Sequence, residues 1–362
     1  MSVSFYKLGE SVGLSLLPMV RIRDEEHQGS FAMGGPDLTF GNPTPHWVRL
    51  PKGFDLSVSH VTEDQFRSVM NSSESGRKLL HDIAKTYQNQ WERPFGGMSN
   101  EHPIDFSHHP MTCVSWQDQK VFFEIVNKMA GIKENKIRRP TEAEMEYAMR
   151  GGWVNVREQA EVEKQSLKTW EDFLAFTQGR YENFVQAIDI SVLILNGDDR
   201  VLKDLLKNGH DVWAMRVYGT ASGRLDESVW WDQLGKGKSH QTREVRTLFD
   251  DLEGFDPDVF MDEFKSQVEE GRIHPYGLTD ANGNVYSWCE DDWDESAYAK
   301  QKSGVENPMV KFKVSDIKVV RGGSWGYDGP DGLRTADRDL NRSGGRSKDI
   351  GFRCARGPQD LK

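Results

Sequence analysis

The sequence is poor in cysteine, and this shortage excludes several classes of protein. Its 362 residues contain three cysteines, Cys113, Cys289 and Cys354, which lie far apart and form no CxxC pair. Zinc ribbons and thioredoxin-like redox motifs need such pairs, so neither is expected. An odd number of widely spaced cysteines favours buried free thiols in a reducing compartment.

The sequence also lacks a long apolar run. The stretch from Val12 to Val20 is interrupted by glycine, serine and proline, whereas a membrane-spanning helix needs about 20 consecutive apolar residues. The first residues lack the basic region of a signal peptide. The chain as given therefore predicts a cytoplasmic location without membrane insertion. The alternatives are that it was cut from a longer precursor or is displayed at a surface through a partner.

Positive charge is in deficit as well. The chain has 57 acidic and 46 basic residues, for a net charge of −11. Because phosphate binding needs a basic face, nucleic acid is excluded as the main partner. Aromatic residues make up 10% of the chain and include 11 tryptophans. Together with a mean hydropathy of −0.68, they predict a folded, loop-rich domain with an aromatic core.

Capping and periodicity signals predict the local elements. Thr62 and Gln65 form one candidate capping box at a helix start, and Thr141 and Glu144 form another. Apolar residues at helical spacing between 118 and 130 predict a further helix that ends at Gly131. Alternation predicts half-buried strands at 47–50 and 54–58 and further strands at 285–289, 319–325 and 350–355.

Residues 153–272 differ in character from both flanking parts. Charged and apolar residues mix there at helical spacing, which predicts a mainly helical insertion. The chain then divides into an N-terminal part, 1–152, the insertion, 153–272, and a C-terminal part of the same domain, 273–362.

Four segments in fixed order resemble the formylglycine-generating-enzyme (sulfatase-modifying factor) family. They are PMTCVSWQD at 110–118, RPTEAEMEYAMRGG at 139–152, YGLTDANGNVYSW at 276–288, and RGGSW with GFRCAR between 321 and 356. The resemblance implies an α+β, loop-rich, C-type-lectin-like fold, with the insertion longer than usual for the family.

The resemblance also implies where catalytic residues would lie. In this family two cysteines that bind copper follow the GGS-aromatic strand, but residues 324–332 contain none. Copper(I) needs soft thiolate ligands, so formylglycine generation is not expected. The HxxxHxE helix of an iron-dependent branch is also missing from the sequence. A non-catalytic protein is therefore favoured, and the alternative is an oxidoreductase of this family with an unrecognised active site.

Calcium is the one cofactor that the resemblance suggests. By position its ligands are Asp280, the carbonyls of Gly283 and Val285, and Ser287, which stands where the family has a glutamate. Loss of one carboxylate predicts a weak site. The alternative is a plain Asx turn at Asp280 with no metal.

Two charged clusters have competing interpretations. The acidic run 290–295 reads as a solvated loop or a cation site, with the loop favoured. Arg321, Arg334, Arg338 and Arg353 resemble a basic patch. Because aspartates lie between them, at 337, 339 and 349, internal ion pairs are the better hypothesis.

The segment 326–349, here called the candidate binding loop, combines scaffold positions with small, polar or aromatic ones. It resembles the variable region of proteins diversified by diversity-generating retroelements, which share the lectin-type fold. Such residues also suit adaptable binding surfaces. The expected function is therefore recognition of a protein or glycan ligand, with the oligomeric state open. The predicted ligand-binding residues are Tyr327, Asp328, Asp331, Asp337, Asp339, Asn341, Ser343 and Ser347.

Overall fold

The computed structural model describes residues 2–8, 17–23, 29–34, 46–88, 109–134, 136–150, 274, 276–301, 304–326 and 335–357. Its strands and helices are listed here in chain order: β1 (Ser2–Leu8), β2 (Leu17–Arg23), β3 (Ser30–Met33), β4 (His46–Arg49), β5 (Phe54–Ser57), α1 (Glu63–Asn71), α2 (Glu74–Gln88), α3 (Asp118–Met129), α4 (Glu142–Met149), β6 (Tyr286–Asp292), α13 (Ala297–Lys300), β7 (Val305–Glu306), β8 (Ile317–Arg321), β9 (Asp339–Arg342), β10 (Ile350–Gly351) and β11 (Ala355–Arg356). The predicted insertion at 153–272 lies outside these residues.

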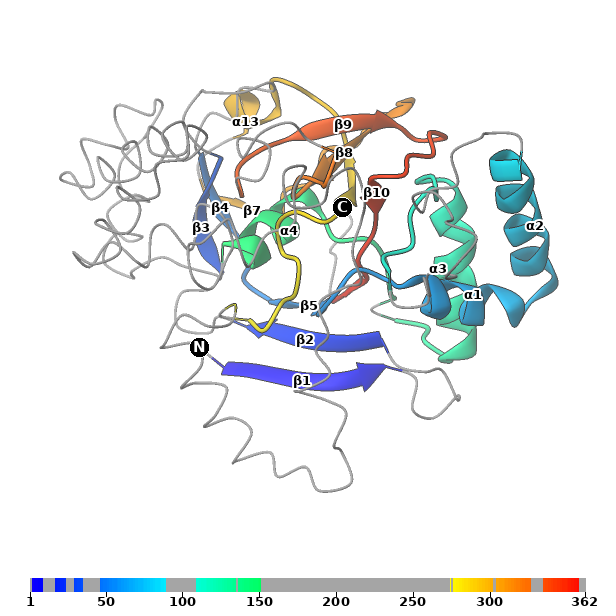
Figure 1. Cartoon of the computed structure of the whole chain (residues 1–362). Helices are drawn as coiled ribbons and strands as arrows, with labels where there is room; N and C mark the ends of the chain where they lie inside the picture. Colours follow the sequence, from blue (N-terminus) through cyan, green and yellow to red (C-terminus); the bar gives the residue numbers. More distant parts are fainter. Residues whose placement is uncertain are drawn as a thin grey trace, which may run out of the picture.

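Three small sheets form the scaffold (Figure 1). One has the order β1-β2-β5-β11, the second β10-β6-β8-β9, and the third β3-β4-β7. The last strand, β11, pairs antiparallel with β5, so that Ala355 lies opposite Leu56. The last strand of the domain therefore lies beside a strand near its N-terminus. The segment between β8 and β11 is consequently flanked by strands that belong to two different sheets.

The two predicted capping boxes are confirmed. At the start of α1 the Thr62 hydroxyl accepts from the Gln65 amide, and the Gln65 side chain accepts from the Thr62 amide. Thr141 and Glu144 make the same reciprocal pair at the start of α4. These contacts satisfy amides that the first turn of a helix leaves without partners, which is why both helices begin at these positions.

The core is aromatic, as the composition predicts. The Phe66 and Phe122 rings stack with their centroids 5.4 Å apart, and the edge of Phe352 packs against both. Trp288 on β6 is fully buried and donates its indole N–H to the carbonyl of Val114 at 3.1 Å. These aromatic side chains, which are far apart in sequence, pack helices α1 and α3 against the sheet that contains β6 and β10.

Two expectations about exposure are wrong. Strand β5 is buried at all four positions instead of on one face, and its Asp55 is tolerated there because Arg21 pairs with it at 2.9 Å. Within the acidic run 290–295, residues 290–292 are part of β6, so the expected solvated loop is wrong there, whereas Glu295 lies outside the strand and is exposed. Arg139 and Lys311 pair with Glu290, and Lys318 pairs with Asp292, which compensates for the cost of burying the acids.

The three cysteines are free and buried, as predicted. Among the described helices, none has both the length and the apolar character needed to cross a membrane.

Candidate functional site

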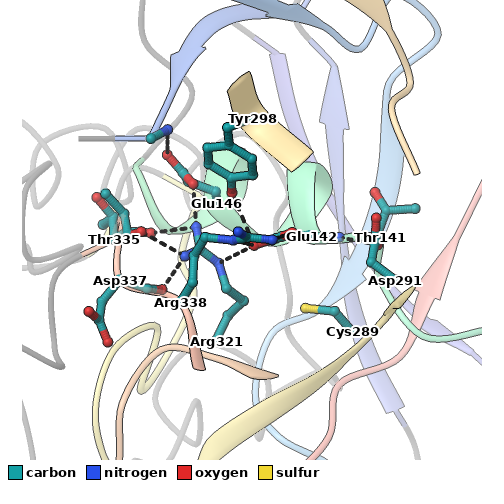
Figure 2. A network of polar contacts seen from close by, with 12 residues as sticks. Thr141, Glu142, Glu146, Cys289, Asp291, Tyr298, Arg321, Thr335, Asp337 and Arg338 are labelled. Carbon is teal, nitrogen blue, oxygen red and sulfur yellow. Dashed lines mark hydrogen bonds and ion pairs between the residues drawn. The ribbon is translucent and has the colours of Figure 1, made fainter. Parts of the chain in front are cut away.

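A buried network of ions lies beneath the start of the described part of the candidate binding loop (Figure 2). Arg338 binds both oxygens of Glu142 on α4, at 2.6 and 2.9 Å. Arg321 on β8 pairs with Glu146, one helical turn further along α4. The Tyr298 hydroxyl of α13 donates to Glu142 at 3.0 Å. Elements from four places in the chain are therefore joined by charge-assisted hydrogen bonds.

Arg321 also holds the backbone of the loop. Its guanidinium donates to the carbonyls of Thr335 and Ala336, each at 2.9 Å, and to that of Asp337. One fully buried side chain thus fixes three consecutive peptide groups and one carboxylate. A planar fork of five donors suits this task, because a single ammonium does not span the same acceptors.

The network shifts the acidity of its members. Burial alone would raise the pKa of Glu142, but Arg338 and Arg321 bring it below the ordinary value. Burial, reinforced by the charge of Glu142, raises the pKa of Tyr298 well above its usual value. The same two causes raise the pKa of Asp291 to about 7. Asp291 accepts backbone N–H groups from Glu142 and Val310, so it links the start of α4 to the segment that follows β7.

Different contacts fasten the C-terminal half of the loop. The Ser343 hydroxyl is 2.7 Å from Asp316 and 2.9 Å from the Gln117 amide nitrogen. Arg346 binds both oxygens of Asp118 in the first turn of α3. Because the described part of the loop is anchored at 335–337 and at 343–346, the residues between these anchors are presented on a fixed frame.

The predicted ligand-binding residues do not share one environment. Asp337 is 6% exposed and Ser343 is 4% exposed, so both face the interior. Asp339, Asn341 and Ser347 are partly exposed. Tyr327, Asp328 and Asp331 lie outside the described residues.

Asp339 and Asn341 also lie on a strand, because β9 runs through the segment expected to be a loop. Burial raises the pKa of Asp339 above its ordinary value, and the hydrogen bond from the Leu340 amide opposes this rise.

The expected calcium turn is a tight turn in the structure. Asp280 and Asn284 have positive φ values of 49° and 59°, and Gly283 has 81°. The carbonyl of Asp280 accepts from Arg353 at 2.7 Å, and its carboxylate accepts from Asn284 at 3.2 Å. These bonds place a cationic guanidinium beside the turn, which opposes the approach of a metal cation.

Of the other calcium candidates, Val285 is buried, and Ser287 lies 2.9 Å from Nε2 of His60. This pair resembles a nucleophile and its base, but Arg353 contacts Nδ1 of the same ring at 3.5 Å. A guanidinium only donates, so this contact favours the tautomer with the proton on Nε2. In that tautomer the ring donates to the serine, which favours a structural role for the pair.

The cysteines have the properties of core residues. Burial, with a smaller contribution from Asp349, raises the pKa of Cys113 to about 12. Burial also raises the pKa of Cys289 and of Cys354. Metal binding and nucleophilic attack need the thiolate, which these environments disfavour. Within the described ranges, no group of three or more His, Cys, Asp and Glu side chains is arranged to hold a metal ion.

The expectation of internal ion pairs is confirmed for Arg321 and Arg338, but with other partners than the nearby aspartates. Their partners are Glu142 and Glu146, which sequence reasoning did not single out. The only local feature of the sequence that points to Glu142 and Glu146 as ion-pair partners is their spacing of four residues, which places both on one face of a helix. Arg353 instead binds backbone carbonyls, and Arg334 lies outside the described residues.

Comparisons with known proteins agree with this architecture. The model of the sulfatase-modifying factor enzyme 1-like domain matches residues 19–200 and 212–358. The formylglycine-generating enzyme of Streptomyces coelicolor is 24% identical over 270 residues, which cover 73% of this chain and 57% of that protein. The serine/threonine-protein kinase pkn1 of Chlamydia caviae is 40% identical over 85 residues, which cover 23% of this chain and 13% of the kinase.

Two solved structures share the fold. Treponema denticola variable protein 1 matches with a TM-score of 0.52 and 17% identity, covering 99% of this chain and 100% of that one. PvdO from Pseudomonas aeruginosa matches with a TM-score of 0.51 and 18% identity, covering 98% and 97%. Because both identities are low, these likenesses concern the fold.

Proposed function

This chain belongs to the family with the sulfatase-modifying factor enzyme 1-like domain, and we propose that it uses the family's fold to bind a ligand without catalysing a reaction. The observation that carries the proposal is the state of its thiols. All three cysteines of the sequence are buried and free, and burial raises the pKa of each. A pair of accessible thiolates for copper(I) is therefore not available.

The candidate binding loop supplies the surface. The described part of this loop, from 335 onward, is fastened by Arg321 at its start and by Arg346 near its end, so little ordering entropy is lost there when a partner binds. The proposed contacts within the described residues are Asp339, Asn341 and Ser347, which are partly exposed. Tyr327, Asp328 and Asp331 are also proposed as contacts, and they lie outside the described residues.

The proposed ligand is a protein or a glycan, because short polar side chains offer hydrogen bonds to either. Retroelement-directed variation of this segment is part of the proposal. It requires a near-copy of the final coding segment beside the gene that differs from it at adenines.

A direct experiment separates binding from catalysis. The purified chain is incubated with copper(I) and a sulfatase-type cysteine peptide, and aldehyde formation is followed by mass spectrometry. We expect neither stoichiometric copper nor aldehyde. Stoichiometric copper together with peptide oxidation would refute the non-catalytic proposal.

The binding surface is tested by screening the chain on a glycan array and against a displayed peptide library. For any ligand found, Asn341→Ala/Ser347→Ala should weaken binding at least about tenfold, or about 1.4 kcal/mol. The matched control is Lys78→Ala/Lys85→Ala on α2, where both residues are exposed. Equal binding by the wild type and both variants would place the site elsewhere on the molecule.

A further inference from the structure

Two large apolar side chains are exposed among the described residues, and they lie two positions apart. Phe312 is 49% exposed and Val314 is 93% exposed. Lys311 and Lys313 alternate with them and are exposed as well. The four residues 311–314, here called the KFKV segment, thus present apolar contact area between positive charges. Single exposed apolar residues are ordinary on a protein surface, whereas exposed apolar side chains that gather in one place suggest an interaction site.

Strand β6 holds the backbone of the KFKV segment in place. Oδ1 of Asp291 accepts the Val310 amide at 2.8 Å, and Oδ2 of Asp292 accepts the Phe312 amide at 2.7 Å. The Asp292 amide in turn donates to the Val310 carbonyl at 2.9 Å. Because these bonds fix the main chain on both sides of Lys311, little backbone entropy is lost when a partner binds the segment.

Positive charge gathers around one tryptophan beside the segment. The centroid of the Trp116 ring lies 4.0 Å from Nζ of Lys318 and 4.7 Å from Nζ of Lys120. Nζ of Lys311 lies 5.5 Å from the same centroid, and the Arg139 guanidinium lies 3.9 Å from it. Four cationic groups therefore surround one indole, whose electron-rich face offsets part of their mutual repulsion.

Acidic side chains balance only part of this charge. Glu290 pairs with Arg139 and Lys311, and Asp292 pairs with Lys318. The exposed cations of this region that form no ion pair with a described residue are Lys120, Lys313 and Arg342. The region is therefore positive, although the whole chain has a net charge of −11.

The KFKV segment adjoins the described part of the candidate binding loop. Just after the segment, the Asp316 carboxylate accepts the Ser343 hydroxyl at 2.7 Å, and the Asp316 carbonyl accepts the Ser343 amide at 2.6 Å. Where β8 pairs with β9, Lys318 lies opposite Asn341. The proposed ligand contact Asn341 is therefore next to a member of the positive cluster.

We propose that the KFKV segment, with the cations beside it, binds an acidic segment of a partner protein that carries an apolar side chain next to its carboxylates. The apolar side chain packs on Phe312 and Val314, and the carboxylates pair with Lys120 and Lys313. The acidic remainder of the chain repels such a partner, so attraction is concentrated at this place. This inference rests on the proposed function for ligand binding itself, and it selects a protein over a glycan.

Two observations favour a protein over other anionic ligands. Val314 offers a sugar no hydrogen bond, whereas it offers apolar contact area to a protein side chain. Anionic membranes and nucleic acids attract proteins with a broad positive face, and the net charge of −11 opposes both.

The first test asks whether residue 314 is open in the full chain. Val314→Cys should react with a thiol reagent in the native protein nearly as fast as a cysteine peptide does. The wild type is the control, because its three cysteines are buried. Slow labelling of Val314→Cys would overturn the proposal, since another part of the chain would then cover this surface.

The second test selects peptides from a displayed random library on the immobilised full chain. We expect enrichment of aspartate and glutamate next to leucine or aromatic residues. Lys313→Ala/Val314→Ala should weaken binding of a selected peptide at least about tenfold, and added sodium chloride should weaken binding to the wild type. The matched control, Lys78→Ala/Lys85→Ala on α2, should bind as the wild type does.

Failure of this inference can be told from failure of the proposed function. If Asn341→Ala/Ser347→Ala weakens peptide binding and Lys313→Ala/Val314→Ala does not, the proposed function stands and this inference falls. Peptide binding that depends on Lys313 and Val314, in a chain that also forms the aldehyde, would support the inference and refute the non-catalytic proposal. A selection that yields no peptide, or peptides without acidic enrichment, would overturn the inference. So would loss of binding to phosphatidylserine vesicles or sulfated glycans in Lys313→Ala/Val314→Ala with peptide binding unchanged.

Discussion

Replacing Arg321 by lysine tests whether this residue is the anchor of the candidate binding loop. The substitution keeps a positive charge near Glu146 but removes the planar fork that reaches the carbonyls of 335–337. A lysine ammonium at this position can serve Glu146 and at most one carbonyl. At least two buried carbonyls then lose their donor.

The expected magnitude follows from those contacts. A buried hydrogen bond contributes about 1 kcal/mol net, so Arg321→Lys should lower the free energy of unfolding by about 2–3 kcal/mol. Arg321→Ala should cost more, about 3–5 kcal/mol, because it breaks the buried pair with Glu146 as well. The matched control is Lys300→Ala, which breaks the exposed pair with Asp294 and should cost less than about 1 kcal/mol.

Urea denaturation followed by tryptophan fluorescence gives the measurement, with the slope of the transition checked for constancy. A loss below about 0.5 kcal/mol in Arg321→Lys would show that the three carbonyl contacts do not stabilise the chain. Equal losses in the lysine and alanine variants would show that charge on this side chain contributes nothing. Either result would refute the reasoning.

Further predictions concern titration, capping and the thiols. Because the pKa of Asp291 is raised to about 7 when folded, the carboxyl of Asp291 stays protonated to a higher pH in the folded chain than in the unfolded chain. Relative to Asp291→Asn, the wild type should therefore lose stability as pH rises from about 4 to about 7, by at most about 1.4 kcal/mol per pH unit in denaturation curves. Thr141→Ala should lower the free energy of unfolding by about 1 kcal/mol, with Thr141→Ser close to the wild type. A thiol reagent at pH 8 should modify the cysteines only as the protein unfolds, and rapid labelling of the native protein would contradict their burial. Asp280→Ala should remove any stabilisation by millimolar calcium in a thermal melt, and an unchanged shift would exclude that turn as the site.

The lectin-type scaffold and the starts of α1 and α4 were predictable from the sequence because their signals are local. The Thr62 and Thr141 boxes need only residues three positions apart, and apolar periodicity indicated the buried face of α3. The family motifs added the order of the elements. The absence of a copper-binding cysteine pair after Trp325 was also readable directly.

The candidate site was predictable only in part. Sequence reasoning placed Asp337 and Ser343 on a binding surface, but both are buried. A segment of polar residues between glycines has the same composition whether its side chains point to solvent or into the protein. The composition of 326–349 therefore fits an exposed loop and an anchored segment equally well. The contact between Ser343 and Gln117 joins residues 226 positions apart, and no local rule predicts it.

The sequence by itself determined the family, the fold class, the starts of α1 and α4 and the lack of copper ligands, because each depends on residue identity or short-range spacing. Only the tertiary structure decided which charges pair and which polar side chains are covered. Arg321 and Glu146 are 175 residues apart and meet because β8 and α4 pack together. The physical reason is that burial and ion pairing are properties of position in space, and chain folding sets that position through many contacts at once.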